Sequence, residues 1–358
     1  MEVRYESANE PMRNALARVA PGTPLRDGID RVVRAQAGAL LVLDDGPDVL
    51  SSCSGGFLVD APYSPQRLSE LAKMDGAIII SVDGGRIARA NVHLVPDPTV
   101  PTSETGTRHR TAERVARSLA VPVVSASEEM GVINVYAGGG KRQLQEVGRL
   151  LERANQALQT LERYKTRLDD SIAKLTAAEA EDVATLRDVA AVVQRGEIAH
   201  RIADEIETMI VELGVDARLL RLQLDELYGE IDNELELVVA DYVADGYTAA
   251  DSLTEMSRLT DDEVHQLRHA AGTLHRAGET YELSQSVTPR GLRLLNRTNQ
   301  LTGDSAARIA AHFDGLSKLQ RATVDELLEV DGIDETAAND VRDTLARVTE
   351  HAILDQYQ

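Results

Sequence analysis

The sequence predicts an α/β domain with a mixed central sheet over residues 1–145, an all-α spine over residues 146–285, and a C-terminal all-α domain over residues 286–358. Three observations lead to this division. Short apolar runs alternate with helical spacing in the first region, apolar residues recur every three or four positions in the second, and short helices follow one another in pairs in the third. A chain of 358 residues also favours two or three domains, because single cores rarely grow past about 250 residues.

Strand-like runs and turn residues define the first region. A stretch with helical spacing over residues 14–37 precedes five expected strands. These strands cover residues 39–43, 77–82, 90–94, 121–124 and 132–136. Gly, Pro and Asp separate the runs, and we expect the three glycines at 138–140 to form an exit turn.

The second region has the periodicity of long helices. It continues from Leu144 to about Tyr242, and the chain has no proline between Pro122 and Pro289. Gly196 and Gly214 are the candidate helix breaks, since glycine weakens a helix interior. We therefore expect a spine of several long helices whose faces could also support self-association.

Helix-start signals recur from about residue 248 to the end of the chain. Thr248 and Thr260 stand where N-caps are expected, each followed by acidic residues. In the last region, residues 288–295 are expected to open the first short helix, and residues 301–310 and 330–338 each resemble a turn that leads into another. This part of the chain is therefore predicted to consist of paired short helices.

Composition restricts the class of protein. Cys53 is the only cysteine, so the chain can form no internal disulfide and no multi-cysteine metal site. The first residues lack the basic cluster and apolar core of a signal peptide, and no apolar run approaches the roughly 20 residues that span a bilayer. We expect a cytoplasmic protein with no membrane partner.

The negative charge is concentrated in the spine. The whole chain has a net charge of −21, and residues 146–285 hold 14 Lys and Arg against 30 Asp and Glu, a net charge of −16. A segment of this charge repels phosphate backbones, which makes it a poor nucleic-acid surface. A solvated helical face, or an organism that favours acidic proteins, is the simpler explanation of this charge and the one we favour.

A basic block, Gly106-Thr107-Arg108-His109-Arg110-Thr111-Ala112-Glu113-Arg114, precedes a run with helical spacing. We expect Thr107 or Thr111 to cap this helix. Free backbone N–H groups, two guanidinium groups and two hydroxyls would then converge on an anion. The alternative is a basic first turn held by surface carboxylates, and a lone histidine such as His109 is often structural.

A second candidate site is Asp75-Gly76, which precedes the apolar run Ala77-Ile78-Ile79-Ile80. Asp-Gly at a strand entrance is commonly just a turn. In the functional interpretation, Asp75 binds a metal ion and Gly76 lets a flat ring approach the backbone. Nucleotidyl transfer needs an acidic side chain to bind a metal ion and basic side chains to bind the phosphates.

The chain resembles the DNA integrity scanning protein (DisA) family, and in particular its actinobacterial members. The signature motifs that carry the resemblance are Asp75-Gly76-Ala77 and Arg108-His109-Arg110. Further matching segments are Gly38-Ala39-Leu40, Ser54-Gly55-Gly56-Phe57, Ala90-Asn91-Val92-His93-Leu94-Val95-Pro96, Arg153-Ala154-Asn155-Gln156-Ala157-Leu158, Leu161-Glu162-Arg163-Tyr164-Lys165 and Leu222-Gln223-Leu224-Asp225-Glu226-Leu227. The resemblance thus covers nearly the whole chain.

This resemblance implies a diadenylate cyclase domain, a helical spine and a helix-hairpin-helix DNA-binding domain. It implies a homo-octamer in which two cyclase domains face each other and join two ATP molecules into cyclic di-AMP, with Mg²⁺ or Mn²⁺ as the metal. The catalytic residues would be Asp75, Arg108, His109 and Arg110, with Asp75 as metal ligand. The nucleotide contacts would come from Gly76, Ala77, Leu94, Thr107, Arg108, His109, Arg110, Thr111 and Ser127.

Two regions depart from the family pattern. Ser127-Glu128-Glu129 looks more like the membrane-anchored branch of these cyclases, so Glu128 could join the metal shell, or the segment could be a polar loop. The second hairpin has Asp334 where a second glycine is wanted, and the first has only Gly303. Affinity for branched DNA would then be weak, or confined to Arg290, Arg293 and Arg297 together with multivalent display by an oligomer. The alternatives are a helical interaction domain without a DNA role, or a DNA-binding scaffold with weak or no cyclase activity.

Overall fold

The computed structural model describes residues 10–128, 131–275, 282–298, 300–301 and 304–355, and the side chains as far as residue 347. The chain forms two compact units. The first comprises residues 1–156 and 206–222, and the second comprises residues 157–205 and 223–358. Gly303, predicted to lie in the first hairpin, falls outside the described residues. The division into three domains expected from the sequence, with boundaries after residues 145 and 285, remains a prediction.

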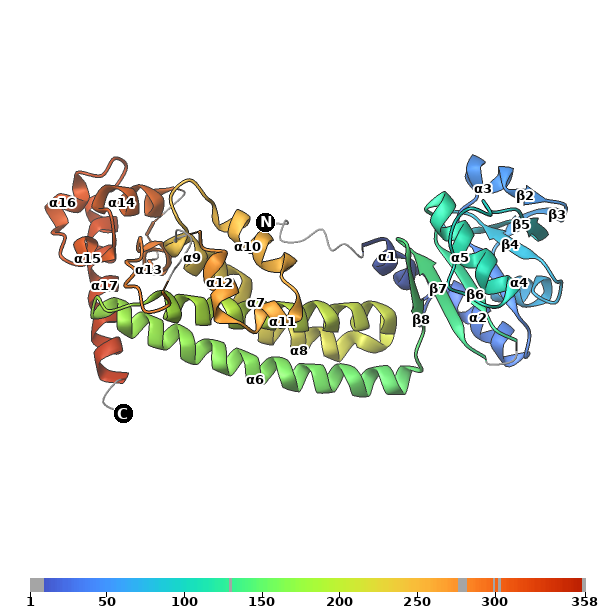
Figure 1. Cartoon of the computed structure of the whole chain (residues 1–358), viewed down its shortest axis with the longest axis horizontal. Coiled ribbons are helices and arrows are strands. Elements are labelled where there is room, and N and C mark those ends of the chain that lie inside the picture. Colours follow the sequence, from blue (N-terminus) through green and yellow to red (C-terminus); the bar gives the residue numbers. More distant parts are fainter. Residues whose placement is uncertain (1–9, 129–130, 276–281, 299, 302–303, 356–358) are drawn as a thin grey trace. The chain divides into compact units, whose positions relative to one another are not determined.

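A mixed sheet forms the centre of the first unit (Figure 1). Its strands are β1 (Ala39–Val42), β2 (Cys53–Ser54), β3 (Phe57–Pro62), β4 (Ala77–Ile80), β5 (Arg86–Leu94), β6 (Val123–Ala126), β7 (Ile133–Ala137) and β8 (Gly140–Gln143). Their order is β2-β5-β4-β1-β6-β7-β8, with β3 also paired to β5. Only the β1–β4 pair is parallel, so the predicted mixed α/β sheet is confirmed.

The expected exit turn at residues 138–140 is instead the turn of a hairpin. Gly138 and Gly139 have positive φ angles of 56° and 75°, and Ala137 pairs with Gly140 across the turn. Glycine adopts this left-handed conformation without steric cost. The strand β8 therefore follows β7 directly and was missed by the prediction, because its residues Gly140–Gln143 carry no apolar run.

Helices cover both faces of this sheet. On one face, α1 (Glu10–Arg18), α2 (Pro24–Arg34) and α4 (Pro65–Leu71) pack on Leu41, Ile78 and Val124. On the other face, α5 (Thr107–Leu119) packs on Leu40 and Ile79, with α3 (Pro47–Ser51) beside it. The two sets of strand residues alternate because successive side chains of a strand point to opposite faces.

The end of α7 (Leu186–Leu213), the 3₁₀ turn η1 (Gly214–Ala217) and the start of α8 (Arg218–Tyr228) belong to the first unit. The carboxylate of Glu212 is buried, pairs with Arg142 of β8 at 3.2 Å, and accepts the backbone N–H of Gln145 at 3.1 Å. Gly214 has a φ of +55° and ends α7, as predicted.

Gly196 does not break a helix, contrary to expectation, because α7 runs through it. A Cβ at this position would lie 2.8 Å from both methyl carbons of Leu235, so glycine here makes room for the neighbouring helix. The sequence gives no sign of this packing role.

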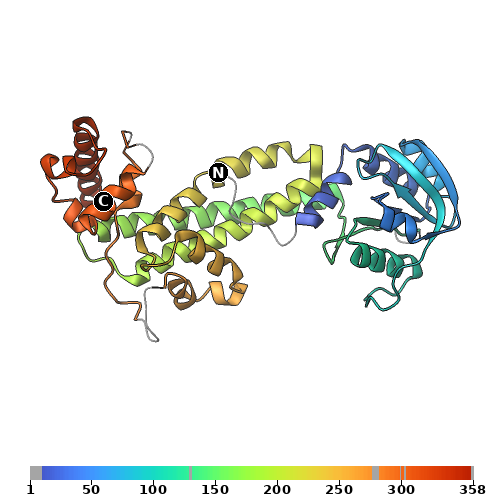
Figure 2. The same cartoon turned by 90° about the horizontal axis from the view of Figure 1, so that it is seen from above.

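The second unit is helical throughout, as predicted for this part of the chain. Its helices are α6 (Val147–Ala180) from residue 157 onward, the first part of α7, the rest of α8, α9 (Ile231–Tyr242), α10 (Ala249–Arg258), α11 (Asp261–Val264), α12 (Leu267–Gly272), α13 (Leu292–Leu295), α14 (Ser305–Phe313), α15 (Leu316–Leu319), α16 (Val324–Leu328) and α17 (Glu335–Asp355). Figures 1 and 2 both show α6 and α7 running side by side within this unit.

Helix starts in this unit match the sequence signals in part. Thr248 and Thr260 are N-caps with complete capping boxes, as expected. The first short C-terminal helix begins at Leu292 after the N-cap Gly291, four residues later than the predicted start at Thr288. The short C-terminal helices share a core of their own that includes Leu295, Ile309, Leu319, Leu327 and Val341. Within the described part of the chain, no helix is both long and apolar enough to cross a bilayer.

Candidate functional site

One edge of the sheet gathers most of the predicted site. The parallel pairing sets Leu41 opposite Ile78, and the same register continued backwards places Gly38 beside Asp75. In the antiparallel neighbours, Ser127 directly follows β6 and Leu94 ends β5 at this same edge. Four segments far apart in the sequence therefore present their ends together.

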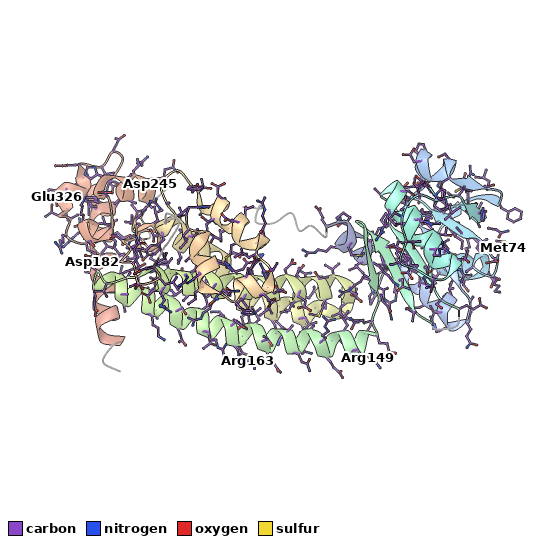
Figure 3. The ribbon with its side chains drawn as sticks, in the orientation of Figure 1. Met74, Arg149, Arg163, Asp182, Asp245 and Glu326 are labelled. Atoms are coloured by element: carbon purple, nitrogen blue, oxygen red, sulfur yellow. The ribbon has the colours of Figure 1, made fainter. Side chains whose placement is uncertain are left out.

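Asp75 lies in the loop between α4 and β4, next to Met74, which Figure 3 labels. The backbone N–H of Gly76 donates to the carbonyl of Met74 at 3.0 Å, which makes a tight turn around Asp75. The Asp75 side chain is fully exposed, and its Oδ1 lies 3.7 Å from Nη2 of Arg108. The predicted convergence of the acid and the first arginine is therefore present in the structure.

Gly38 makes room for the Arg108 guanidinium. A Cβ on Gly38 would lie 1.9 Å from Nη1 and 2.6 Å from Cζ of Arg108. Any larger residue before β1 would push the guanidinium away from Asp75. No local sequence pattern around Gly38 indicates this role.

The first turn of α5 has no side-chain cap, so the expectation that Thr107 or Thr111 caps it is wrong. Gly106 is the N-cap, with extended backbone (φ −80°, ψ 145°), and Thr107 is already the first helical residue. The first intrahelical bond runs from the N–H of Arg110 to the carbonyl of Gly106 at 2.8 Å. The three preceding N–H groups therefore have no partner within the helix.

This first turn is suited to an anion. It contains no acidic residue, Thr107 and Arg110 are exposed, and Arg108 is 31% exposed. Helix N-termini bind anions through free N–H groups and the helix dipole, and guanidinium groups bind phosphate oxygens in pairs. Thr111 is half-buried one residue after Arg110.

His109 points toward the sheet. Its Nδ1 lies 3.0 Å from Oγ of Ser125 and 3.1 Å from Oη of Tyr136, two hydroxyls that are buried in β6 and β7. Burial lowers the pKa of His109 below its usual value, with Lys141 and Arg108 acting in the same direction and Glu104 against them. The Nδ1 atom thus has a structural anchor, and a phosphate contact would have to come from Nε2.

Gly76 is required by the backbone next to it. A Cβ at this position would lie 2.5 Å from Cα and 2.6 Å from the carbonyl carbon of Asn91. Asn91 has a φ of +53° where the pairing of β4 with β5 is irregular, and a Cβ on Gly56 would also come close to the Asn91 backbone, 2.8 Å from its carbonyl oxygen. The reason for glycine here is this close approach of β5. A nucleotide contact at Gly76 remains a prediction.

Ala77 and Leu94 are buried in the core under α5, with 2% and 4% of their surface exposed. Ser127 is half-buried, and its backbone N–H donates to the carbonyl of Val132 at 2.9 Å. Glu128 is exposed beyond the end of β6. The ligand contacts predicted for these residues remain predictions.

The donor set fits Mg²⁺ or Mn²⁺ held jointly with a substrate. Among the described residues there is no cluster of three or more His, Cys, Asp or Glu side chains that could hold an ion by themselves. Mg²⁺ is commonly bound through one or two carboxylates plus substrate phosphates. Asp75 next to Arg108 and the open first turn of α5 offers this arrangement.

The arginines expected to contact DNA are engaged within the protein. Arg293 is fully buried, and its guanidinium pairs with Glu179 and, at 3.4 Å, with Glu234. Arg297 also pairs with Glu234 at 3.3 Å. Arg290 pairs at 2.8 Å with Asp245, which Figure 3 labels.

The expectation that Arg293 contacts DNA is therefore wrong. Buried ion pairs hold a helix in place and leave the cation no access to a phosphate. Sequence alone could not show this, because the partners lie 59 to 114 residues away along the chain.

Comparisons with known proteins agree with the geometry. A family model described as DisA bacterial checkpoint controller nucleotide-binding matches residues 26–141, and one described as the DisA bacterial checkpoint controller linker region matches residues 144–282. A structure of DacA from Staphylococcus aureus is 25% identical over 38% of this chain and 87% of that chain, but its TM-score of 0.27 is too low to support an inference.

Full-length relatives are much more similar. The DNA integrity scanning protein DisA of Streptomyces coelicolor is 48% identical over 97% of this chain and 94% of its own. The protein of the same name from Frankia alni is 49% identical over 96% of this chain and 97% of its own. Both are actinobacterial, as the resemblance had indicated. The chain therefore belongs to the DNA integrity scanning protein DisA family.

Proposed function

We propose that the chain is a diadenylate cyclase that condenses two ATP molecules into cyclic di-AMP. The observation that carries the proposal is the Asp75 carboxylate 3.7 Å from the Arg108 guanidinium, beside an uncapped helix N-terminus. A carboxylate for a divalent cation and cationic groups for phosphate oxygens are the two components that nucleotidyl transfer requires.

In this reaction the 3′-hydroxyl oxygen of each ATP attacks the α-phosphorus of the other. The bond from the α-phosphorus to the bridging oxygen of the β-phosphate breaks, pyrophosphate leaves, and the hydroxyl proton passes to solvent. Two such steps give the cyclic dinucleotide and two pyrophosphates. Mg²⁺ or Mn²⁺, held by Asp75 and the phosphates, would neutralise phosphate charge and acidify the attacking hydroxyl.

The remaining predicted contacts divide between the two parts of ATP. The phosphates would be held by Arg108, Arg110 and the free N–H groups of the first turn of α5. Further phosphate contacts would come from Nε2 of His109, Thr107, Thr111 and Ser127. The backbone of Gly76 and Ala77 and the buried side chain of Leu94 would line the nucleoside side. Glu128 would join the metal shell.

The exposure of the site favours pairing of two protomers. Asp75 is fully exposed, and Thr107 and Arg110 are exposed as well, so one chain by itself leaves the reacting groups in water. A second protomer facing this edge would bring the other ATP and exclude solvent, which supplies proximity and strengthens the electrostatic interactions. A homo-octamer built from such pairs is part of the proposal.

Incubation of the full chain with ATP and Mn²⁺ or Mg²⁺, followed by product analysis and light scattering, tests this function. We expect cyclic di-AMP and pyrophosphate from an oligomer, and loss of product in Asp75→Asn. Asp30→Asn is the matched control, because Asp30 also pairs with an arginine, Arg26 at 2.8 Å, but lies on α2 away from the site. Absence of product with the unmodified chain, or equal product from Asp75→Asn, would refute the assignment.

A DNA-binding scaffold with weak or no cyclase activity is the second candidate, and the C-terminal helices bear on it. Gly332 lies in the turn between α16 and α17 and has a φ of +77°. A Cβ added to Gly332 would lie 3.0 Å from Nη2 of Arg308, an exposed residue. Asp334 accepts the N–H of Ala337 at 2.8 Å, so its carboxylate caps the start of α17 and would repel a phosphate there. We assign contact with branched DNA to Arg308 at this turn.

A gel shift on branched DNA at a stated salt concentration separates the two candidates. Binding by the full chain without any ATP turnover would favour the scaffold. Weaker binding in Arg308→Ala than in Arg290→Ala would support the assigned contact, and equal weakening of both would remove it.

A further inference from the structure

A network of hydrogen-bonded polar groups lies behind the first turn of α5, buried where it meets the sheet and exposed at its Lys141 end. It links His109 of α5, Ser125 of β6, Tyr136 of β7, Glu104 in the segment before α5, and Lys141 of β8. Ser125 and Tyr136 are 0% and 1% exposed. None of these residues except His109 belongs to the site described above.

The hydrogen atoms in this network of polar groups can be assigned one by one. Lys141 lies 2.5 Å from Oε1 of Glu104, and the hydroxyl of Tyr136 donates to the same oxygen at 3.2 Å. Burial raises the pKa of Glu104, but the hydrogen bonds from Lys141 and Tyr136 outweigh it, so the pKa is lowered overall. Glu104 is therefore an ionised carboxylate, which can only accept.

The phenol of Tyr136 has a single hydrogen, and this hydrogen is directed at Glu104. The lone pairs of the same oxygen face Nδ1 of His109 at 3.1 Å. Two acceptors at this distance would repel, so Nδ1 has to carry a hydrogen and donate it to Tyr136. The pKa of His109 is lowered by burial, so the ring is neutral and its other nitrogen, Nε2, is bare.

We propose that Tyr136, oriented by Glu104 and Lys141, holds His109 in the neutral Nδ1–H tautomer and is a positioning residue for the first turn of α5. The bond ties the start of the helix to strand β7, at a residue two positions from Thr107 and one from Arg108. A carboxylate that fixes a histidine through a hydrogen-bond chain is a recurrent way to set ring orientation. The effect on catalysis rests on the proposed function, whereas the tautomer does not.

Alternative hydrogen-bond partners give the proposal its test. Without the Tyr136 acceptor, Ser125 at 3.0 Å can donate to a bare Nδ1, and neutral imidazole in water carries its proton mainly on Nε2. Without Glu104, the Tyr136 hydrogen is released and can also turn to Nδ1. Tyr136→Phe and Glu104→Ala should therefore both convert His109 to the Nε2–H tautomer, whereas Ser125→Ala should leave it as Nδ1–H.

Nitrogen shifts of histidine-labelled, sedimented full chain in solid-state NMR read the tautomer directly, with His109→Gln identifying the signal. The expected result is Nδ1–H in the unmodified protein and in Ser125→Ala, and Nε2–H in the other two variants. Glu104 is partly exposed and outside the core, so Glu104→Ala tests the proposal even if Tyr136→Phe does not fold. An Nε2–H signal in the unmodified protein, or no change in both variants, would overturn it.

Cyclase assays then test the positioning role. We expect kcat/KM for ATP to fall about ten- to a hundredfold in Tyr136→Phe, since small misplacements of binding groups cost this much. Tyr63→Phe is the matched control, because its hydroxyl donates to the carbonyl of Pro24 on the opposite side of the sheet. A changed tautomer with kcat/KM within twofold of the unmodified chain would disprove positioning. No product from the unmodified chain would disprove only the proposed cyclase.

Discussion

Replacing Gly38 by alanine should disturb the site without disturbing the fold. The new Cβ would lie 1.9 Å from Nη1 of Arg108, and ordinary contact begins near 3.4 Å, so the guanidinium has to move by roughly 1.5 Å. The atom that collides is the far end of a flexible side chain, so it can move at small cost. The displaced group is the one that faces Asp75.

Two small terms nearly cancel in the free energy of unfolding. The backbone of Gly38 is outside the left-handed region, so alanine gains about 0.4–1 kcal/mol by restricting the unfolded chain. An off-rotamer Arg108 costs about 0.5–1.5 kcal/mol. The net change is within about 1 kcal/mol, which is a few degrees in Tm for a domain of this size.

Cyclase activity should respond much more strongly. A displacement of about 1 Å in a group that holds a reacting phosphate costs up to about a hundredfold, so we expect kcat/KM to fall ten- to a hundredfold. Production of cyclic di-AMP from ATP and thermal unfolding are measured on the same preparation. Gly148→Ala is the control, because, apart from its own helical turn, no atom of the described residues lies within 4 Å of the position that a Cβ would take. Unchanged kcat/KM in Gly38→Ala, or a loss that follows a large fall in Tm, would refute the reasoning.

Three further perturbations follow from the packing and the charges. Gly76→Ala puts a Cβ 2.5 Å from backbone of β5, which cannot yield, so calorimetry should show a loss of about 1–3 kcal/mol, against a small gain for Gly148→Ala. Arg293→Ala leaves the buried carboxylate of Glu179 without its cation and removes one of the two arginines that pair with Glu234, so it should cost about 3–5 kcal/mol in denaturant unfolding, with a much smaller loss for Arg290→Ala. The pKa of His109 is lower in the folded chain than in the unfolded chain, so the unfolded chain binds the proton first as the pH falls. The stability that is present above about pH 6.5 should therefore be lost as the pH falls through the folded pKa. His109→Gln should flatten this pH dependence.

Each of these has a clear contrary outcome. Equal stability of Gly76→Ala and Gly148→Ala would show that β5 can retreat from the new methyl group. A loss for Arg293→Ala no larger than for Arg290→Ala would show that the buried Glu179 carboxylate finds another partner. A pH dependence of unfolding that is identical with and without His109 would place the titration on other groups.

Local patterns in the sequence were sufficient for several features. Apolar runs bounded by Gly, Pro and Asp gave five of the strands, because a buried strand must be apolar and must end where the chain turns. The capping boxes at Thr248 and Thr260 formed where predicted, since their hydrogen bonds join residues three apart. The two short motifs around Asp75 and Arg108 were recognisable because their chemistry is contained in a few adjacent residues.

Other features required contacts between distant residues. The role of Gly38 depends on the register of β1 against β4 and on the rotamer of Arg108, 70 residues later. The tautomer of His109 depends on a hydroxyl and a carboxylate from two further segments. The burial of Arg293 depends on carboxylates from α6 and α9, which no pattern around Arg293 reveals.

The sequence by itself determined the types of secondary structure, the family and the two motifs that indicate a nucleotide site, because each of these depends on residues that are close together in the sequence. Only the tertiary structure decided that Gly106 leaves the first turn of α5 uncapped, that the backbone of Asn91 approaches Gly76 too closely for a side chain, and that Arg293 forms a buried ion pair. The physical reason is that capping, close approach and ion pairing depend on distances between chain segments, which strand register and helix packing set.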